Sequence, residues 1–236
     1  MNKLVMFAGV VALAGVMSGC VSTAVDDDPV AKWQKERFAS DAITALQKDN
    51  KLPSAMDVSV KSSIGVKPAA AIINTFDAPF AAAYAKVVKN ADELYFKTVK
   101  GHAIYQNVAD AAHDNKTSID VESAKLPAEE KKVFDEYIAY AKGLKQEDQD
   151  STLKLIEELI GQFAEGAQQV AGVGDKVRAC PEFAALAGFE AVKEGKNLSS
   201  DLVDLKDQMA SATTGLNEWK RLVEIDKAAR EYAIKR

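Results

Sequence analysis

The chain has 236 residues, of which 47% are hydrophobic and 28% are charged, and its formal net charge is −5. Removal of residues 1–19 would take away one lysine and no acid, so that 29 Lys plus Arg would face 35 Asp plus Glu, a balance of −6. Such a chain lacks the basic footprint that phosphate backbones require, which argues against a nucleic-acid partner. Its length suffices for one domain with a sizeable core.

The first twenty residues, MNKLVMFAGVVALAGVMSGC, have the order of a secretory signal. A short positive head ends at Lys3, an uncharged apolar run covers Leu4 to Val16, and small residues precede Cys20. The apolar run is shorter than the roughly 20 residues that a membrane-spanning helix needs. We therefore expect a signal peptide that is removed. An uncleaved membrane span is an alternative, since the run extends weakly to Val25.

The residues Met17-Ser18-Gly19-Cys20 resemble the lipobox of bacterial lipoprotein precursors, although Leu is commoner in that family at the place of Met17. The resemblance implies that a diacylglyceryl group is attached to Cys20 through a thioether, that cleavage occurs before this cysteine, and that the new amino terminus is acylated, for example with palmitate. Two or three acyl chains make a lasting anchor, whereas one holds only marginally. Because Val21 and not Asp comes after the cysteine, the resemblance favours the outer membrane, facing the periplasm, in a host that has two membranes.

These features divide the chain into a signal peptide (1–19), a lipidated tether (20–28) and a helical bundle domain (29–236). Once Cys20 is lipidated, Cys180 has no intrachain disulfide partner, so stability must come from packing. Cys180 precedes Pro181, and a helix start at this point would lower a thiol pKa. We prefer the simpler interpretation of Cys180 as a small buried apolar residue.

The first predicted helix runs from about Pro29 to about Asp49, with Asp28 as its cap. Its expected inward face carries Trp33, Phe38, Ala42, Ile43 and Leu46. From Leu52 to Val66 the apolar residues alternate with polar ones, which is the period of an extended strand. Because no second strand is evident to pair with it, we expect an extended crossover along the bundle.

A long helical region is predicted from Pro68 to about Asp114, with a break or kink at Pro79 and with Asp77 as the cap of the helical segment after the break. Beyond Pro79, apolar residues recur at steps of three and four and form one stripe. His102 lies on this stripe, so we interpret it as a core or boundary histidine with a hydrogen-bond partner.

Three further helices are predicted before the last one. The first runs from about Pro127 to Lys145, with acids in its first turn, where they suit the helix dipole. The second carries an apolar face from Leu153 to Val170 and should break at AGVGDK. The third runs from Pro181 to Lys193 and should turn at EGKN.

The last predicted helix, from Leu198 to Ile234, has the most regular apolar seam of the chain. The seam has a mean period of 3.5 and consists of Leu198, Leu202, Leu205, Met209, Ala212, Leu216, Trp219 and Val223. This period favours left-handed, coiled-coil-like packing, either against the long helix that bears Tyr84 or against another subunit, and we prefer the former. Asp226 and Arg230 continue the register, so we expect the apolar contact to end near Val223 and these two residues to pair with each other.

Together these elements predict an all-α protein, an elongated antiparallel bundle of about five to seven helices with a short extended crossover.

The sequence offers few residues for chemistry. It contains no G-x-S-x-G, no H-E-x-x-H and no cysteine pair for zinc. The two histidines, His102 and His113, stand about 16 Å apart on one helix at 1.5 Å per residue, too far to share a metal ion. Asp110, His113 and Asp114 share a helical face and would need another segment to hold a divalent ion, so we prefer a solvated helix end. We predict no catalytic, cofactor-binding or metal-binding residue, and Cys20 is the only predicted site.

These observations favour a lipid-anchored cell-envelope protein with a structural or protein-binding role and no enzymatic activity. One alternative is a membrane-active protein that resembles the helical pore-forming toxins in architecture, because Pro68 to Val88 contains only two charged residues, Asp77 and Lys86. The other alternative is a bundle whose interior binds a small ligand or a metal ion.

Overall fold

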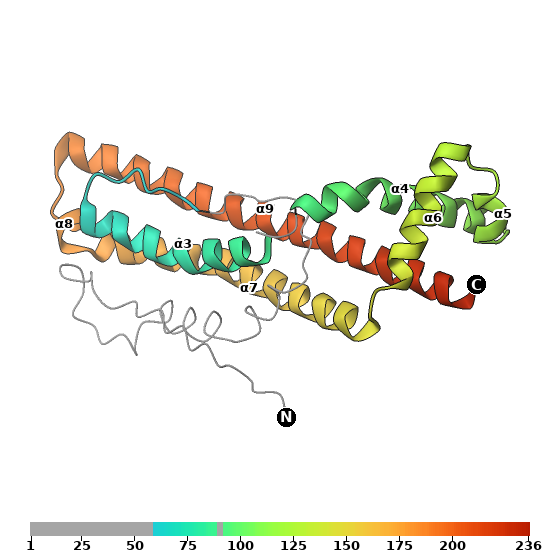
Figure 1. Cartoon of the computed structure of the whole chain (residues 1–236). Coiled ribbons are helices and arrows are strands. Elements are labelled where there is room, and N and C mark those ends of the chain that lie inside the picture. The colour runs from blue at the N-terminus through green and yellow to red at the C-terminus, as the bar shows by residue number, and fades with distance from the viewer. Residues whose placement is uncertain (1–58, 89–91) are drawn as a thin grey trace, which may run out of the picture.

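The computed structural model describes residues 59–88 and 92–236, and all regular secondary structure in this part of the chain is helical. The helices are α3 (Lys67–Val88), α4 (Asp92–Asp114), α5 (Ile119–Ser123), α6 (Ala128–Lys142), α7 (Gln146–Ala179), α8 (Pro181–Ala184) and α9 (Gly188–Lys235). They form an elongated bundle (Figure 1). The predicted all-α bundle is therefore confirmed, whereas the signal, the tether and the first predicted helix lie outside the described residues.

The long helices α7 and α9 form an antiparallel hairpin that runs through most of the molecule (Figure 1). Two ion pairs of 2.7 Å tie their exposed edges, Lys220 to Glu157 and Lys227 to Asp150. The hydrophobic seam predicted for α9 is buried except for the half-buried Leu202. Its main partner is α7 and not the helix that bears Tyr84, because the short connection through α8 brings α7 back alongside α9.

Two predicted helix breaks are wrong. The segment AGVGDK lies inside α7, where Val173, Gly174 and Val177 continue the buried stripe. The segment EGKN lies inside α9, where Glu194 and Leu198 are buried. The chain instead turns between Cys180 and Gly188, and Gly188 begins α9 with a φ of +57°, a left-handed conformation that glycine adopts without strain.

Helix α3 packs against the α7–α9 hairpin, mainly on α7, and adds its apolar side chains to the core. It continues through Pro79, so of the break or kink predicted there the break is wrong. Phe76 and Phe80 are buried on either side of this turn, and the ring of Phe80 packs against that of Phe163 on α7 with centroids 5.3 Å apart. The apolar character of this helix is thus explained by its contact with α7.

Residues Ser59–Val66, which we call the strap, run extended beside α9 before α3 begins (Figure 1). The expected crossover is confirmed for these residues. A backbone outside helix and sheet must find other partners for its amides. The buried carboxylate of Asp201 on α9 supplies several, accepting hydrogen bonds from Ser62 Oγ at 2.6 Å, from Ser63 Oγ at 2.7 Å and from the Ser63 amide at 3.0 Å.

Two further buried acids hold the ends of the strap. Oε2 of Glu194 accepts a hydrogen bond of 2.7 Å from the Gly65 amide. Oδ2 of Asp77 accepts one of 2.8 Å from the Val60 amide, so Asp77 fastens the strap and the prediction that it caps a helix is wrong. Each of these buried carboxylates has hydrogen-bond donors from the strap, and Glu194 also pairs with Lys193 at 3.6 Å. The three acids therefore have a structural role.

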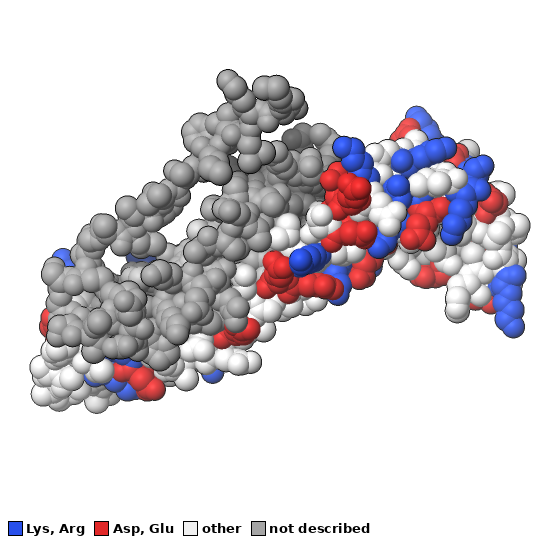
Figure 2. Space-filling model, turned by 90° about the horizontal axis from the view of Figure 1, so that it is seen from below, with Lys and Arg blue, Asp and Glu red and all other residues white. Residues whose placement is uncertain are grey.

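The surface carries charges of both signs. On the part of the face in Figure 2 that is not covered by grey atoms, basic and acidic side chains alternate without forming a field of one sign. This distribution agrees with the small negative net charge of the chain. None of the helices in the described residues carries an apolar stretch long enough to span a bilayer.

Candidate functional site

A buried polar cluster joins α4, α6 and the C-terminal part of α9, toward the end of the bundle that carries α5 and the C-terminus (Figure 1). It consists of His102, Tyr137 and Asp226, all of which are buried. The Tyr137 hydroxyl donates a 2.6 Å hydrogen bond to Oδ1 of Asp226, and Nε2 of His102 lies 2.8 Å from the same oxygen. The rings of His102 and Tyr137 are 4.9 Å apart between centroids. Both groups face a carboxylate that is otherwise surrounded by the hydrophobic core.

Gly101 allows this cluster to form. A Cβ atom built at position 101 would lie 2.7 Å from Cβ and 2.8 Å from Cγ of Tyr137, closer than such atoms approach. A side chain here would push α4 away from α6. The glycine thus brings the next residue, His102, within reach of α6 and α9.

The electrostatic setting keeps the tyrosine hydroxyls of this region protonated. Burial raises the pKa of Tyr137 far above its usual range, and the negative charge of Asp226 raises it further. Burial and Asp226 also raise the pKa of Tyr140, in that order. Burial, together with the smaller effect of the charge of Glu231, raises the pKa of Tyr105 to about 12. At neutral pH these hydroxyls therefore donate hydrogen bonds and do not act as bases.

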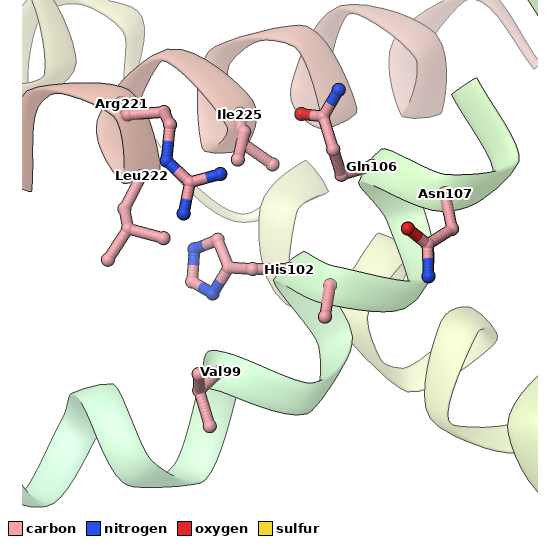
Figure 3. Close-up of a pocket in the computed structure, with 8 residues that line it drawn as sticks. Val99, His102, Gln106, Asn107, Arg221, Leu222 and Ile225 are labelled. Atoms are coloured by element: carbon pink, nitrogen blue, oxygen red, sulfur yellow. The ribbon is translucent and has the colours of Figure 1, made fainter. Parts of the chain in front are cut away.

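A pocket of about 200 Å³ opens beside this cluster, between α4 and α9. Its lining consists of Val99, His102, Ala103, Gln106, Asn107, Arg221, Leu222 and Ile225. Figure 3 shows Arg221 reaching from α9 toward the imidazole of His102, with Val99 on the α4 side. The arrangement offers an apolar space with one cation at its edge, which suits binding of a small molecule.

The residues that the sequence singles out lie in different places. The interpretation of His102 as a core histidine is confirmed by its burial and its contact with Asp226. His113 and Asp114 are exposed at the end of α4, with His113 Nδ1 3.4 Å from Asp114 Oδ1. Asp110 is exposed and accepts a 2.7 Å hydrogen bond from Gln106. In the part of the chain that the structure describes, no three His, Cys, Asp or Glu side chains form a metal-binding group.

Cys180 is fully buried at the end of α7, and its sulfur is in a disulfide. The expectation that Cys180 has no intrachain disulfide partner applies to a chain whose Cys20 is lipidated. The only other cysteine of the chain is Cys20, which lies outside the described residues. A sulfur that carries a lipid thioether cannot also take part in a disulfide. Lipidation of Cys20 and an intrachain disulfide of Cys180 therefore exclude each other and predict opposite results in a thiol-labelling test.

Sequence reasoning missed the partners of Asp226 and Arg230. They were expected to pair with each other, but Asp226 faces Tyr137 and His102, and Arg230 Nε donates a 2.7 Å hydrogen bond to the Leu144 carbonyl oxygen. The apolar contact also continues past Val223, because Ala229 and Ala233 are buried. The sequence feature that could have indicated these partners is the acid Asp226 on an otherwise apolar seam, because a buried carboxylate requires hydrogen-bond donors.

Comparison with protein-family models, with curated proteins and with solved structures finds no match to this chain. What the chain does is therefore inferred from its own residues.

Proposed function

We propose that this chain is a lipid-anchored protein of the bacterial cell envelope that acts by binding other proteins and not by catalysing a reaction. The lipobox-like residues Met17–Cys20 support the anchor. In this proposal the acyl chains on Cys20 hold the protein at the membrane, on the outer membrane of a host that has two, and the helical bundle makes the contacts.

An exposed apolar face on α9 supports the binding role and is the observation that carries it. Phe189 is 79% exposed, Val192 59% and Val203 53%, and we call these three residues the α9 patch. At 3.6 residues per turn their positions lie on one side of the helix. Large apolar side chains that water surrounds on one face favour a contact with a partner.

Crosslinking in the host tests the binding role. A photoreactive phenylalanine analogue in place of Phe189 should give a discrete protein adduct, because the side chain is already aromatic and exposed. The same analogue in place of Glu224, an exposed residue of α9 about 32 Å along the helix from Val203 at 1.5 Å per residue, is the control. No adduct at position 189, or equal adducts at both positions, would contradict a partner on the α9 patch. Adducts with lipid alone would favour the membrane-active alternative.

Metabolic labelling tests the anchor. A fatty-acid analogue supplied to the host should label the protein, and Cys20→Ala should abolish the label. Label that survives this substitution would contradict lipidation at Cys20, while the crosslinking result would still report on the α9 patch.

The membrane-active alternative rested on Pro68 to Val88, and the described part of this segment has another explanation. Ile73, Phe76, Phe80 and Tyr84 are buried in the bundle core. Leakage of dye from liposomes is the direct test of this alternative, and we expect none.

A further inference from the structure

We propose that the pocket between α4 and α9 binds a small monocarboxylate, whose carboxylate group pairs with Arg221 and whose apolar body occupies the space between the two helices. This inference goes beyond the proposed function and does not depend on the lipid anchor, so either can fail without the other.

Arg221 is the group that selects the ligand class. Its side chain has no hydrogen bond or ion pair with any of the described residues. Three basic residues that lie near Arg221 on α9 are engaged, since Lys220 pairs with Glu157, Lys227 with Asp150, and Arg230 bonds to a backbone carbonyl. The planar guanidinium donates two parallel hydrogen bonds to a carboxylate. A guanidinium that lies over a pocket without a partner among the described residues therefore favours a carboxylate ligand.

The charges around the pocket agree with an anionic ligand. Its lining among the described residues contains Arg221 and His102 and no acidic side chain. The nearby carboxylate of Asp226 already faces the Tyr137 hydroxyl and Nε2 of His102. Its printed contacts lie inside the bundle, and Asp226 is not among the residues that line the pocket.

The walls and the size indicate an apolar body. Val99, Ala103, Leu222 and Ile225 supply hydrocarbon on both helices, and Gln106 and Asn107 add two amides to the lining. A cavity of roughly 150 Å³ lined by apolar side chains holds benzene. The volume of about 200 Å³ thus suits a ring or a short alkyl chain that carries one carboxylate.

Methyl NMR of the purified full-length protein tests the proposal, with benzoate and hexanoate as the probes. The methyl groups of Val99, Leu222 and Ile225 line the pocket and should shift in a saturable way. Acetate carries the charge without the apolar body and should bind more weakly, by roughly fourfold per buried methylene. Benzyl alcohol and 1-hexanol carry a similar apolar group without the charge, and they should not saturate the site in the concentration range in which the carboxylates do.

The variants separate the guanidinium from general effects. Arg221 is exposed, so Arg221→Gln should fold normally and weaken benzoate binding about tenfold or more. Arg221→Lys keeps the charge without the planar fork and should bind with intermediate affinity. Lys206→Gln removes one positive charge from the same helix outside the pocket and should leave the affinity unchanged.

Three results would overturn the proposal. Saturable shifts that Arg221→Gln leaves unchanged would show that the guanidinium does not bind the carboxylate. Acetate binding as tightly as hexanoate would show that the apolar walls are unused. Absence of saturable shifts at the pocket methyl groups with both carboxylate probes would show that the pocket does not bind this class of molecule.

Discussion

The Tyr137 hydroxyl lies 2.6 Å from Oδ1 of Asp226 and joins α6 to α9 across 89 positions of the sequence. Because the bond is buried and its acceptor is a carboxylate, Tyr137→Phe should lower the free energy of unfolding by about 1.5–3 kcal/mol. Urea denaturation measures this loss. Tyr232→Phe is the matched control, since the Tyr232 hydroxyl donates an equally short bond to Asp120 at the surface and should cost less than about 1 kcal/mol. Equal losses would mean that burial of Asp226 adds nothing to the bond.

Gly101 and Gly161 should respond in opposite ways to the same substitution. Gly101→Ala places a methyl group 2.7 Å from Cβ of Tyr137 and should destabilise the protein by about 1–3 kcal/mol. Gly161 lies in α7, and the methyl group of Gly161→Ala would meet no atom of another part of the protein within 4 Å. This substitution should therefore stabilise the protein by about 0.5–1 kcal/mol. Thermal or urea unfolding distinguishes the signs. A stabilising Gly101→Ala would show that α4 and α6 are not in close contact there.

Fastening of the strap by Glu194 should weaken in acid. The hydrogen bond from the Gly65 amide is the main cause that lowers the pKa of Glu194. The carboxylate therefore contributes stability above its unfolded pKa of about 4.3, and this contribution is lost as the pH falls through the lower folded pKa. Glu194→Gln should lower the melting temperature at pH 6. Between about pH 5 and 3, the melting temperature of this variant should fall less steeply than that of the parent protein.

The control for this pH profile is Glu190→Gln, one turn away on α9 with its side chain 60% exposed and outside the contacts of the strap. Its melting temperature should match that of the parent at every pH. If Glu194→Gln also runs parallel to the parent, the bond to Gly65 does not fasten the strap in solution.

The chemistry of the two cysteines distinguishes the lipid anchor from a disulfide. If Cys20 is lipidated as proposed, Cys180 has no intrachain partner, and a maleimide should label it in denatured protein without any reductant. Its complete burial should make the labelling of folded protein much slower. Mass spectrometry of the Cys180 peptide measures both rates. Labelling of denatured protein that appears only after reduction would establish the disulfide and argue against lipidation of Cys20.

The sequence predicts the helices and the α9 seam well because their signal is local. The spacing that placed Leu205 and Leu216 on one stripe is a property of a single helix, and both residues are completely buried. The predicted breaks failed because packing overcomes weak local preferences. A glycine within a helix costs about 1 kcal/mol relative to alanine, which burial of neighbours such as Val173 and Val177 offsets. The missing amide of Pro79 is likewise offset by the burial of Phe76 and Phe80.

The candidate site was only half visible in the sequence. Helical spacing placed His102 on an apolar stripe and Asp226 in the register of the α9 seam, beyond the expected end of its apolar contact, and it does not say which helices lie opposite. The contact between these two residues depends on α4 and α6 both packing against α9, and that arrangement is set by the whole bundle. Arg221 gave no signal, because a single arginine on a charged helix becomes distinctive only when its neighbours are known to be apolar or already paired.

The strap imposes an order on the assembly of the molecule. Ser62 and Asp201 are 139 positions apart, whereas α7 and α9 are joined through a short turn at α8. Contacts between distant positions form late, since closing a long loop costs more entropy than closing a short one. The α7–α9 hairpin should therefore form first and create the row of acceptors to which the strap then binds. During synthesis from the amino terminus the strap is made early, but its Ser63 and Gly65 amides must wait for Asp201 and Glu194 and stay in water until the last long helix exists.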